Sequence, residues 1–174
     1  MKKLLIVNPG STSTKVAVYY GSERKFSETI SHPAQELQPF ANVLDQADYR
    51  AGVIARCLEQ AGLSAGDMDG VIAIGGLLKP VDSGVYRVSE AMLRDLRSRV
   101  YGEHAANLGA VIADGIGRKY GLPAFVGDPI TVDEMQPLAR VSGHPLLPRY
   151  GRTHTLNHLS LIHISEPTRR RGIS

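Results

Sequence analysis

Residues 4–20 read LLIVNPGSTSTKVAVYY, which is two apolar runs separated by a polar turn. The first run is short, rich in branched residues and ended by Pro9 and Gly10, which is typical of a buried strand that stops abruptly. The second run, from Val16 to Tyr20, follows after only a few residues. Because so short a link favours antiparallel neighbours, we predict two adjacent strands joined by this turn.

The turn has the composition of an anion-binding loop. Gly10 lets the main chain approach a ligand closely, and successive amides can form a nest for an anion. Lys15 adds a positive charge, and hydroxyl groups come from Ser11, Thr12, Ser13 and Thr14. An ordinary polar hairpin loop is the alternative, because the same residue types fill unliganded turns.

Two familiar nucleotide-binding motifs are excluded here. A Walker-type loop needs Gly directly before its Lys and Ser or Thr after it, whereas Thr14 and Val16 flank Lys15. The dinucleotide fingerprint G-x-G-x-x-G occurs nowhere in the 174 residues.

Composition indicates one globular domain without a membrane or nucleic-acid partner. Hydrophobic residues make up 43% of the chain and charged residues 21%, and no apolar stretch approaches the ~20 residues that span a bilayer. The net charge of +3 includes Arg169, Arg170 and Arg171, and residues 1–158 hold 17 basic and 16 acidic residues. Since Met1 leads into a strand without a signal-peptide pattern, we expect a cytoplasmic protein. Cys57 has no disulfide partner and is interpreted as a small core residue.

The remaining pattern alternates helices and strands. After three strands near residues 3–8, 14–21 and 24–31, helical spacing covers 49–62, and buried strands are predicted at 69–74 and 123–127. Ser89 is the expected cap of a helix to about residue 100, and a second helix is expected from near 103 to 120. A strand, helix, strand succession implies parallel pairing. The order describes an α/β, ribonuclease-H-like mixed sheet.

Four segments together resemble the butyrate kinase family, in the acetate kinase branch of the actin, Hsp70 and sugar kinase superfamily. They are VNPGSTSTK (7–15), GGLLKP (75–80), GEHAANLG (102–109) and DPITVDEM (128–135). The resemblance implies an actin-like ATPase sheet with helices on both faces, as the first of two domains. It also implies phosphoryl transfer between ATP and a short-chain fatty acid, with Mg²⁺, giving an acyl phosphate and ADP.

The resemblance also assigns roles to residues. The phosphates of ATP would lie along Asn8, Gly10, Ser11, Ser13 and Lys15. Asp128 would act in catalysis by holding Mg²⁺, although a turn carboxylate is its ordinary reading. His154, in THTLN (153–157), would donate a hydrogen bond to the transferring phosphoryl group. The acyl pocket would include Gly75, Gly76, Glu103 and His104, with a plain helix-terminal charge as the alternative for Glu103.

One residue departs from the family pattern. The family pattern has Arg before Gly-Gly-Leu-Leu, and this chain has Ile74. Arginine would hold a carboxylate or phosphate through two hydrogen bonds, which isoleucine cannot do. Either Lys79 or Arg87 replaces it, or activity is weakened, or the residue is a sequence error.

The resemblance covers residues 1–158, which we expect to be a truncated amino-terminal kinase domain. Residues 159–174 resemble a translated sequencing adapter, and a natural strand with a basic tail is the alternative. We expect a fragment that is inactive and associates through exposed apolar surface. A non-catalytic acyl-binding or interaction module is the alternative function. The preferred acid and the oligomeric state, including a homo-oligomer, stay open.

Overall fold

A mixed sheet forms the centre of the computed structural model, which describes residues 1–151. Within these residues the strand order is β3-β2-β1-β4-β6-β5. The strands are β1 (Lys3–Pro9), β2 (Ser13–Tyr20), β3 (Glu23–Ser31), β4 (Gly70–Ile74), β5 (Val85–Arg87) and β6 (Ala124–Gly127). The helices are α1 (Ala34–Leu37), α2 (Ala47–Gln60), α3 (Glu90–Ser98) and α4 (Asn107–Tyr120), with short 3₁₀ turns at Val43–Gln46, Ala65–Asp67 and Pro137–Arg140.

Strand pairing follows the predicted pattern. β1, β2 and β3 pair as antiparallel neighbours, whereas β1 with β4 and β4 with β6 are parallel. The short β5 pairs antiparallel with the outer edge of β6. Since parallel strands end at one edge of a sheet, β1, β4 and β6 deliver the residues that follow Pro9, Ile74 and Gly127 to the same place.

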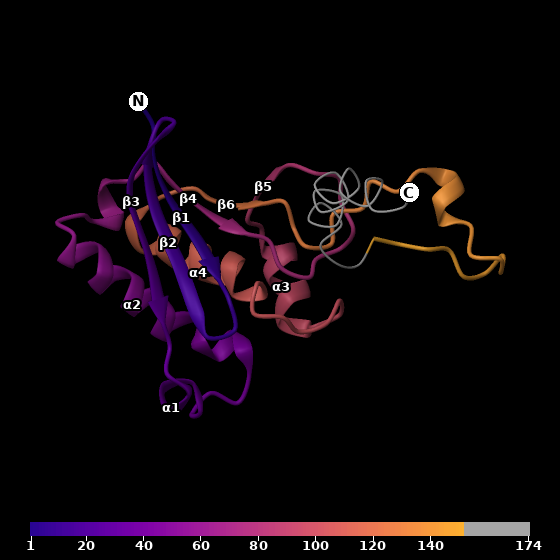
Figure 1. Cartoon of the computed structure of the whole chain (residues 1–174), viewed down its shortest axis with the longest axis horizontal. Coiled ribbons are helices and arrows are strands. Elements are labelled where there is room, and N and C mark those ends of the chain that lie inside the picture. The colour runs from indigo at the N-terminus through magenta and orange to yellow at the C-terminus, as the bar shows by residue number, and fades with distance from the viewer. Residues whose placement is uncertain (152–174) are drawn as a thin grey trace, which may run out of the picture.

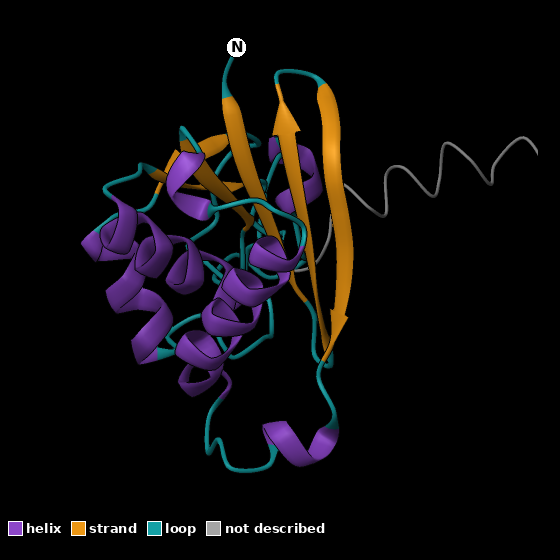
Figure 2. Ribbon diagram, turned by 90° about the vertical axis from the view of Figure 1, so that its left-hand side faces the viewer, coloured by secondary structure: helices purple, strands orange, loops and turns teal. Residues whose placement is uncertain are grey.

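The hydrophobic core lies between the sheet and its long helices. Alternate residues of β1 and β2 are fully buried and pack with apolar residues of α2 and α4. Leu93 and Leu96 of α3 pack against Val126, which belongs to the same sheet face. The helices in Figure 2 accordingly gather on one side of the strands. The mixed sheet is confirmed, but within residues 1–151 the long helices cover one face rather than both.

Three local features differ from the sequence predictions. Helix α4 begins at Asn107 rather than near Glu103, because the side chains of Glu103 and His104 accept hydrogen bonds from the amides of Val43 and Ala106. The segments β5 and α1 were not predicted, since three or four residues are too short for a periodic pattern. By contrast, Ser89 caps α3 as predicted, with its hydroxyl accepting from the Met92 amide at 3.3 Å.

Candidate functional site

A cavity of about 680 Å³ opens at the edge where β1, β4 and β6 end. In sheets of this kind, ligands bind outside the carboxyl ends of parallel strands. Four of the residues predicted to form the site line this cavity together, although they are up to 120 positions apart in the sequence: Asn8, Gly10, His104 and Asp128. Ile74 lines it as well, at the end of β4. Figure 1 labels these three strands, which are neighbours in the sheet.

The β1–β2 turn lies at one side of the cavity. Its backbone is closed by the Gly10 amide, which donates to the Ser13 carbonyl at 2.7 Å. Ser11 and Thr12 are exposed, and their amides donate to no other residue of the described part. Lys15 is exposed on β2 opposite Asn8, with no ion pair among residues 1–151. Ser11 lies in the turn and Ser13 and Lys15 at the start of β2, and none of the three lines the cavity.

Asp128 follows β6 directly and adopts a left-handed backbone conformation with φ of 33°. Its Oδ1 accepts hydrogen bonds from the Ser83 hydroxyl and the Gly84 amide, both at 2.8 Å. Through Oδ1, Asp128 therefore acts as an ordinary turn carboxylate. Its Oδ2 accepts no hydrogen bond within residues 1–151 and is available for a cation.

Asp128 offers a single carboxylate to a cation in the described part of the chain. Among the described residues, no group of three or more His, Cys, Asp or Glu could enclose a metal ion. Mg²⁺ characteristically uses one or two carboxylates and completes its shell with water and substrate phosphates. A single exposed carboxylate of this kind is compatible with such a site.

Gly75 and Gly76 have a packing role at the end of β4. A Cβ atom on Gly75 would lie 2.6 Å from Pro129 Cα, and one on Gly76 would lie 2.6 Å from Asn107 Cα. The Asn107 side chain then accepts from the Leu77 amide at 2.8 Å. These two glycines let β4 approach the start of α4 and the segment after β6. Neither lines the 680 Å³ cavity, so their predicted place in an acyl pocket gains no support.

Glu103 lies apart from the cavity, in contrast to His104. Its Oε1 accepts from the Val43 amide at 3.0 Å, and its Oε2 lies 3.7 Å from Arg99 Nη1. The carboxylate therefore ties the loop before α4 to the 3₁₀ turn at Val43–Gln46. His104 lines the cavity, and its Nδ1 accepts from the Ala106 amide at 3.1 Å.

Curated proteins similar to this chain share one description. The chain is 49% identical over 155 residues to a probable butyrate kinase of Listeria innocua, and 45% identical to butyrate kinase 2 of Clostridium acetobutylicum. Each match covers 89% of this chain and 44% of the relative. This chain is similar to part of a butyrate kinase. It spans less than half the length of these butyrate kinases, and no protein-family model matches it.

Solved structures agree with the butyrate kinase homology at the level of the fold. The chain superposes on acetate kinase from Porphyromonas gingivalis with a TM-score of 0.60 and 13% identity, covering 97% of this chain and 49% of that one. Acetate kinase from Entamoeba histolytica gives a TM-score of 0.51, also at 13% identity, over 95% of this chain and 47% of that one. The predicted fold class is confirmed, because the chain has the fold of about half of each of these acetate kinases.

The position of Ile74 bears on the butyrate kinase resemblance. The residue is 39% exposed and lines the cavity, at the position where the family resemblance led us to expect arginine. Lys79 lines a different cavity, with Tyr101 and Thr131, and the exposed Arg87 lies on β5 beside Phe125. Neither suggested replacement lines the 680 Å³ cavity, which has no Lys or Arg among its described lining residues.

Sequence reasoning missed Arg50, which packs behind the β1–β2 turn from helix α2. A signal was present, because Arg50 stands on the same helical stripe as the buried Ile54 and Leu58. A charged residue on an apolar stripe indicates a buried polar contact. The predicted His154 lies outside the described residues, as does the segment 159–174.

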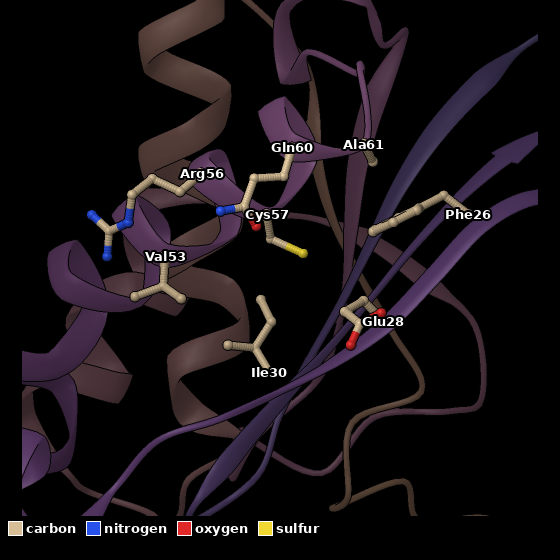
Figure 3. A pocket seen from close by; sticks show the side chains of 8 residues that line it. All are labelled: Phe26, Glu28, Ile30, Val53, Arg56, Cys57, Gln60 and Ala61. Carbon is tan, nitrogen blue, oxygen red and sulfur yellow. The ribbon is translucent and has the colours of Figure 1, made fainter.

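A second cavity, of about 470 Å³, lies between β3 and α2 and is shown in Figure 3. Cys57, Glu28 and Arg56 line it, and it contains none of the predicted site residues. Burial and the nearby Glu28 raise the pKa of the Cys57 thiol. The side chain is half-buried and belongs to neither core cluster, so its interpretation as a core residue gains no support. Among residues 1–151 no helix combines the length and hydropathy needed to span a bilayer.

Proposed function

We propose that this chain is the amino-terminal part of a butyrate kinase, which transfers a phosphoryl group from ATP to the carboxylate of butyrate or a related short-chain acid. The products would be an acyl phosphate and ADP. The observation that carries the proposal is the 49% identity to a butyrate kinase over 155 residues, together with a cavity lined by Asn8, Gly10 and Asp128. The wider family supports ATP and Mg²⁺ as cofactors.

The residues around the cavity suit this reaction. A carboxylate is a poor nucleophile toward an anionic phosphate, so the site must bring two negative partners together and stabilise the developing charge. Unpaired amides at Ser11 and Thr12 and the ammonium of Lys15 supply donors for phosphate oxygens. Bound Mg²⁺ would neutralise phosphate charge, and Asp128 Oδ2 would hold it. We retain His154 as the proposed donor to the transferring phosphoryl group.

We further propose that residues 1–158 form the kinase domain and that 159–174 are not part of the natural enzyme. The adenosine pocket and the second phosphate loop would then belong to the part of the kinase that this chain lacks. The enzyme would be cytoplasmic, with ATP, ADP and a short-chain acid or its acyl phosphate as partners. On its own, this chain would bind phosphate without turning over.

A second candidate function is a non-catalytic acyl-binding or interaction module. The observation that favours it is Ile74, because the 680 Å³ cavity then has an apolar residue where the family has a cation. An apolar wall accommodates an acyl chain but does not neutralise a carboxylate.

Acyl-hydroxamate formation from butyrate, ATP, Mg²⁺ and hydroxylamine separates the two functions. The assay compares the chain as given with a protein in which the natural frame is restored beyond residue 158. We expect product only from the restored protein, and about a hundredfold lower kcat for its Asp128→Asn variant. Asp67→Asn is the matched control, because Asp67 is exposed in the 3₁₀ turn away from the cavity. A restored protein without activity would favour the binding module.

A further inference from the structure

Arg50 is the largest fully buried side chain of the described residues, with 1% exposure. It extends from helix α2 to the back of the β1–β2 turn. Its Nη1 donates to the carbonyl oxygens of Gly10 and Ser13, at 2.8 and 3.1 Å, and its Nη2 donates to that of Ser11 at 2.9 Å. One guanidinium thus holds three carbonyls of the candidate phosphate turn.

The same contacts determine where the amides of the turn point. In a planar trans peptide the C=O of one residue and the N–H of the next point in opposite directions. Because Arg50 binds the carbonyls of Gly10 and Ser11, the amides of Ser11 and Thr12 must point away from it. The remaining carbonyl, that of Thr12, accepts from the His32 amide at 2.8 Å. Each carbonyl from Gly10 to Ser13 thus accepts a hydrogen bond, and the amides of Ser11 and Thr12 point away from Arg50.

The charge of Arg50 has no anionic partner among residues 1–151. Its other hydrogen bonds are to the neutral oxygens of Thr14, at 3.1 Å, and Gln46, at 2.8 and 3.1 Å. No Asp or Glu of the described part forms an ion pair with it. His32, which is in contact with Thr14, has its pKa lowered by burial and by Arg50, so it is neutral at pH 7.

A buried cation without a carboxylate is unusual, because desolvation penalises the charge unless something compensates it. Carbonyl dipoles compensate part of it here. A phosphate on the far side of the turn would compensate the rest, since an electrostatic interaction through protein is screened less than one through water.

We propose that Arg50 is a positioning residue for phosphate binding: it orients the amides of Ser11 and Thr12 toward the phosphate and provides a fixed positive charge behind the turn. This inference rests on the proposed function, because it takes the Gly10–Thr14 turn as the place where nucleotide phosphates lie. It assigns to α2 a part in the site that neither the motifs nor the cavity lining indicates.

Tripolyphosphate is the probe, since it carries the phosphate chain of ATP without requiring an adenosine pocket. Its Kd is measured by titration calorimetry on the full 174-residue chain, and the amide resonances of Ser11 and Thr12 are followed by NMR in the same titration. We expect Arg50→Met to weaken binding about tenfold or more. Arg50→Lys should weaken it about threefold, because lysine keeps the positive charge but lacks the planar guanidinium that binds several carbonyls at once. Arg56→Met is the matched control, since Arg56 is exposed on the same helix and should leave Kd unchanged.

The outcomes separate a positioning role from a merely structural one. A structural role would lower the melting temperature of the Arg50 variants and leave Kd for the folded protein unchanged, which would overturn the inference. If Arg50→Met does not fold, Arg50→Lys decides alone, and wild-type affinity in that variant contradicts the proposal. Wild-type chain that shows no shift of the Ser11 and Thr12 amides also overturns it. Binding is measured without butyrate or turnover, so failure of acyl transfer is a separate result.

Discussion

His32 links the β1–β2 turn to Tyr49, and through Tyr49 to Glu36, by hydrogen bonds. The ring is 3% exposed, and its Nε2 lies 2.8 Å from Thr14 Oγ1 while its Nδ1 lies 3.4 Å from the Tyr49 hydroxyl. Tyr49 in turn donates to Glu36. Burial lowers the pKa of His32, Arg50 lowers it further, and Glu36 opposes both. Protonation would therefore place a second buried cation beside Arg50.

This arrangement predicts a pH dependence of stability. The unfolded chain binds the His32 proton more tightly than the folded chain, so stability falls as pH decreases from the unfolded pKa, about 6.5, toward the lower folded pKa. We expect the free energy of unfolding of the wild-type protein to decrease as the pH is lowered from about 7.5 to about 5. The free energy of unfolding of His32→Gln should decrease less over the same interval. Urea denaturation at several pH values measures the difference, and equal slopes for the two proteins would contradict it.

Single residues show where sequence reasoning succeeds and where it stops. Gly10 was singled out because it follows an apolar run that ends in turn residues. Asp128 was assigned through the family resemblance, since an aspartate after a strand is ordinarily a turn carboxylate. Arg50 was overlooked, since an arginine in an amphipathic helix ordinarily lies on the solvated face. Only the register of α2 against the turn shows that this arginine reaches Gly10, and that register depends on packing between distant segments.

Helix α4 and strand β4 show how small residues determine the distance between elements. A Cβ atom on Gly109 of α4 would lie 2.3 Å from the Ile74 carbonyl oxygen and 3.1 Å from Ala73 Cβ. Gly115 of the same helix is exposed, and a Cβ atom there would have no neighbour within 4 Å. The two glycines differ in packing while sharing one helix.

Substituting each glycine by alanine should therefore change stability in opposite directions. Gly109→Ala would force α4 away from β4 and destabilise the fold by about 1–3 kcal/mol. Gly115→Ala should stabilise it by about 0.5–1 kcal/mol, because alanine restricts the unfolded chain and favours the helix. Chemical denaturation gives both values. Destabilisation of similar size at both positions would show that close packing against β4 is not the cause.

Element boundaries were predictable wherever a local signal marks them. The hydroxyl cap at Ser89 and the periodic run of α2 fixed two helices correctly. The start of α4 was placed too early, because Glu103 forms a long-range contact with Val43 that no local pattern contains. The short β5 exists only through pairing with β6, so its own sequence has too few residues to indicate a strand.

Several large apolar side chains of the segment 138–150 are exposed in the described part of the chain. They are Leu138, Val141, Leu146, Leu147 and Tyr150, each more than half exposed. Clustered apolar surface favours self-association. We expect the average mass in sedimentation velocity to rise with protein concentration.

Replacing Leu146 and Leu147 by serine should reduce that rise. Val85→Ser is the matched control, because Val85 is exposed on β5 outside the segment. A protein that sediments as a monomer at every concentration would contradict the prediction, as would equal association of the double variant and the control.

At this scale the sequence predicted the mixed sheet and its parallel core, whereas the one-sided helical cover could not be predicted. Alternation along β1 and β2 separates buried from partly exposed residues but does not say what lies over the second face. The segment that would cover such a face need not be near it in sequence.

The order of the strands also has a consequence for synthesis on the ribosome. β1, β2 and β3 are joined by short turns, so this meander can pair as soon as about its first 31 residues have emerged. The cavity requires β4 and then β6, because β1 pairs with a segment 66 positions later and β4 with one 53 positions later. Contacts over such distances form slowly. The β1–β2 turn is therefore synthesised first, and the cavity beside it is complete only after Asp128 has been added to the chain.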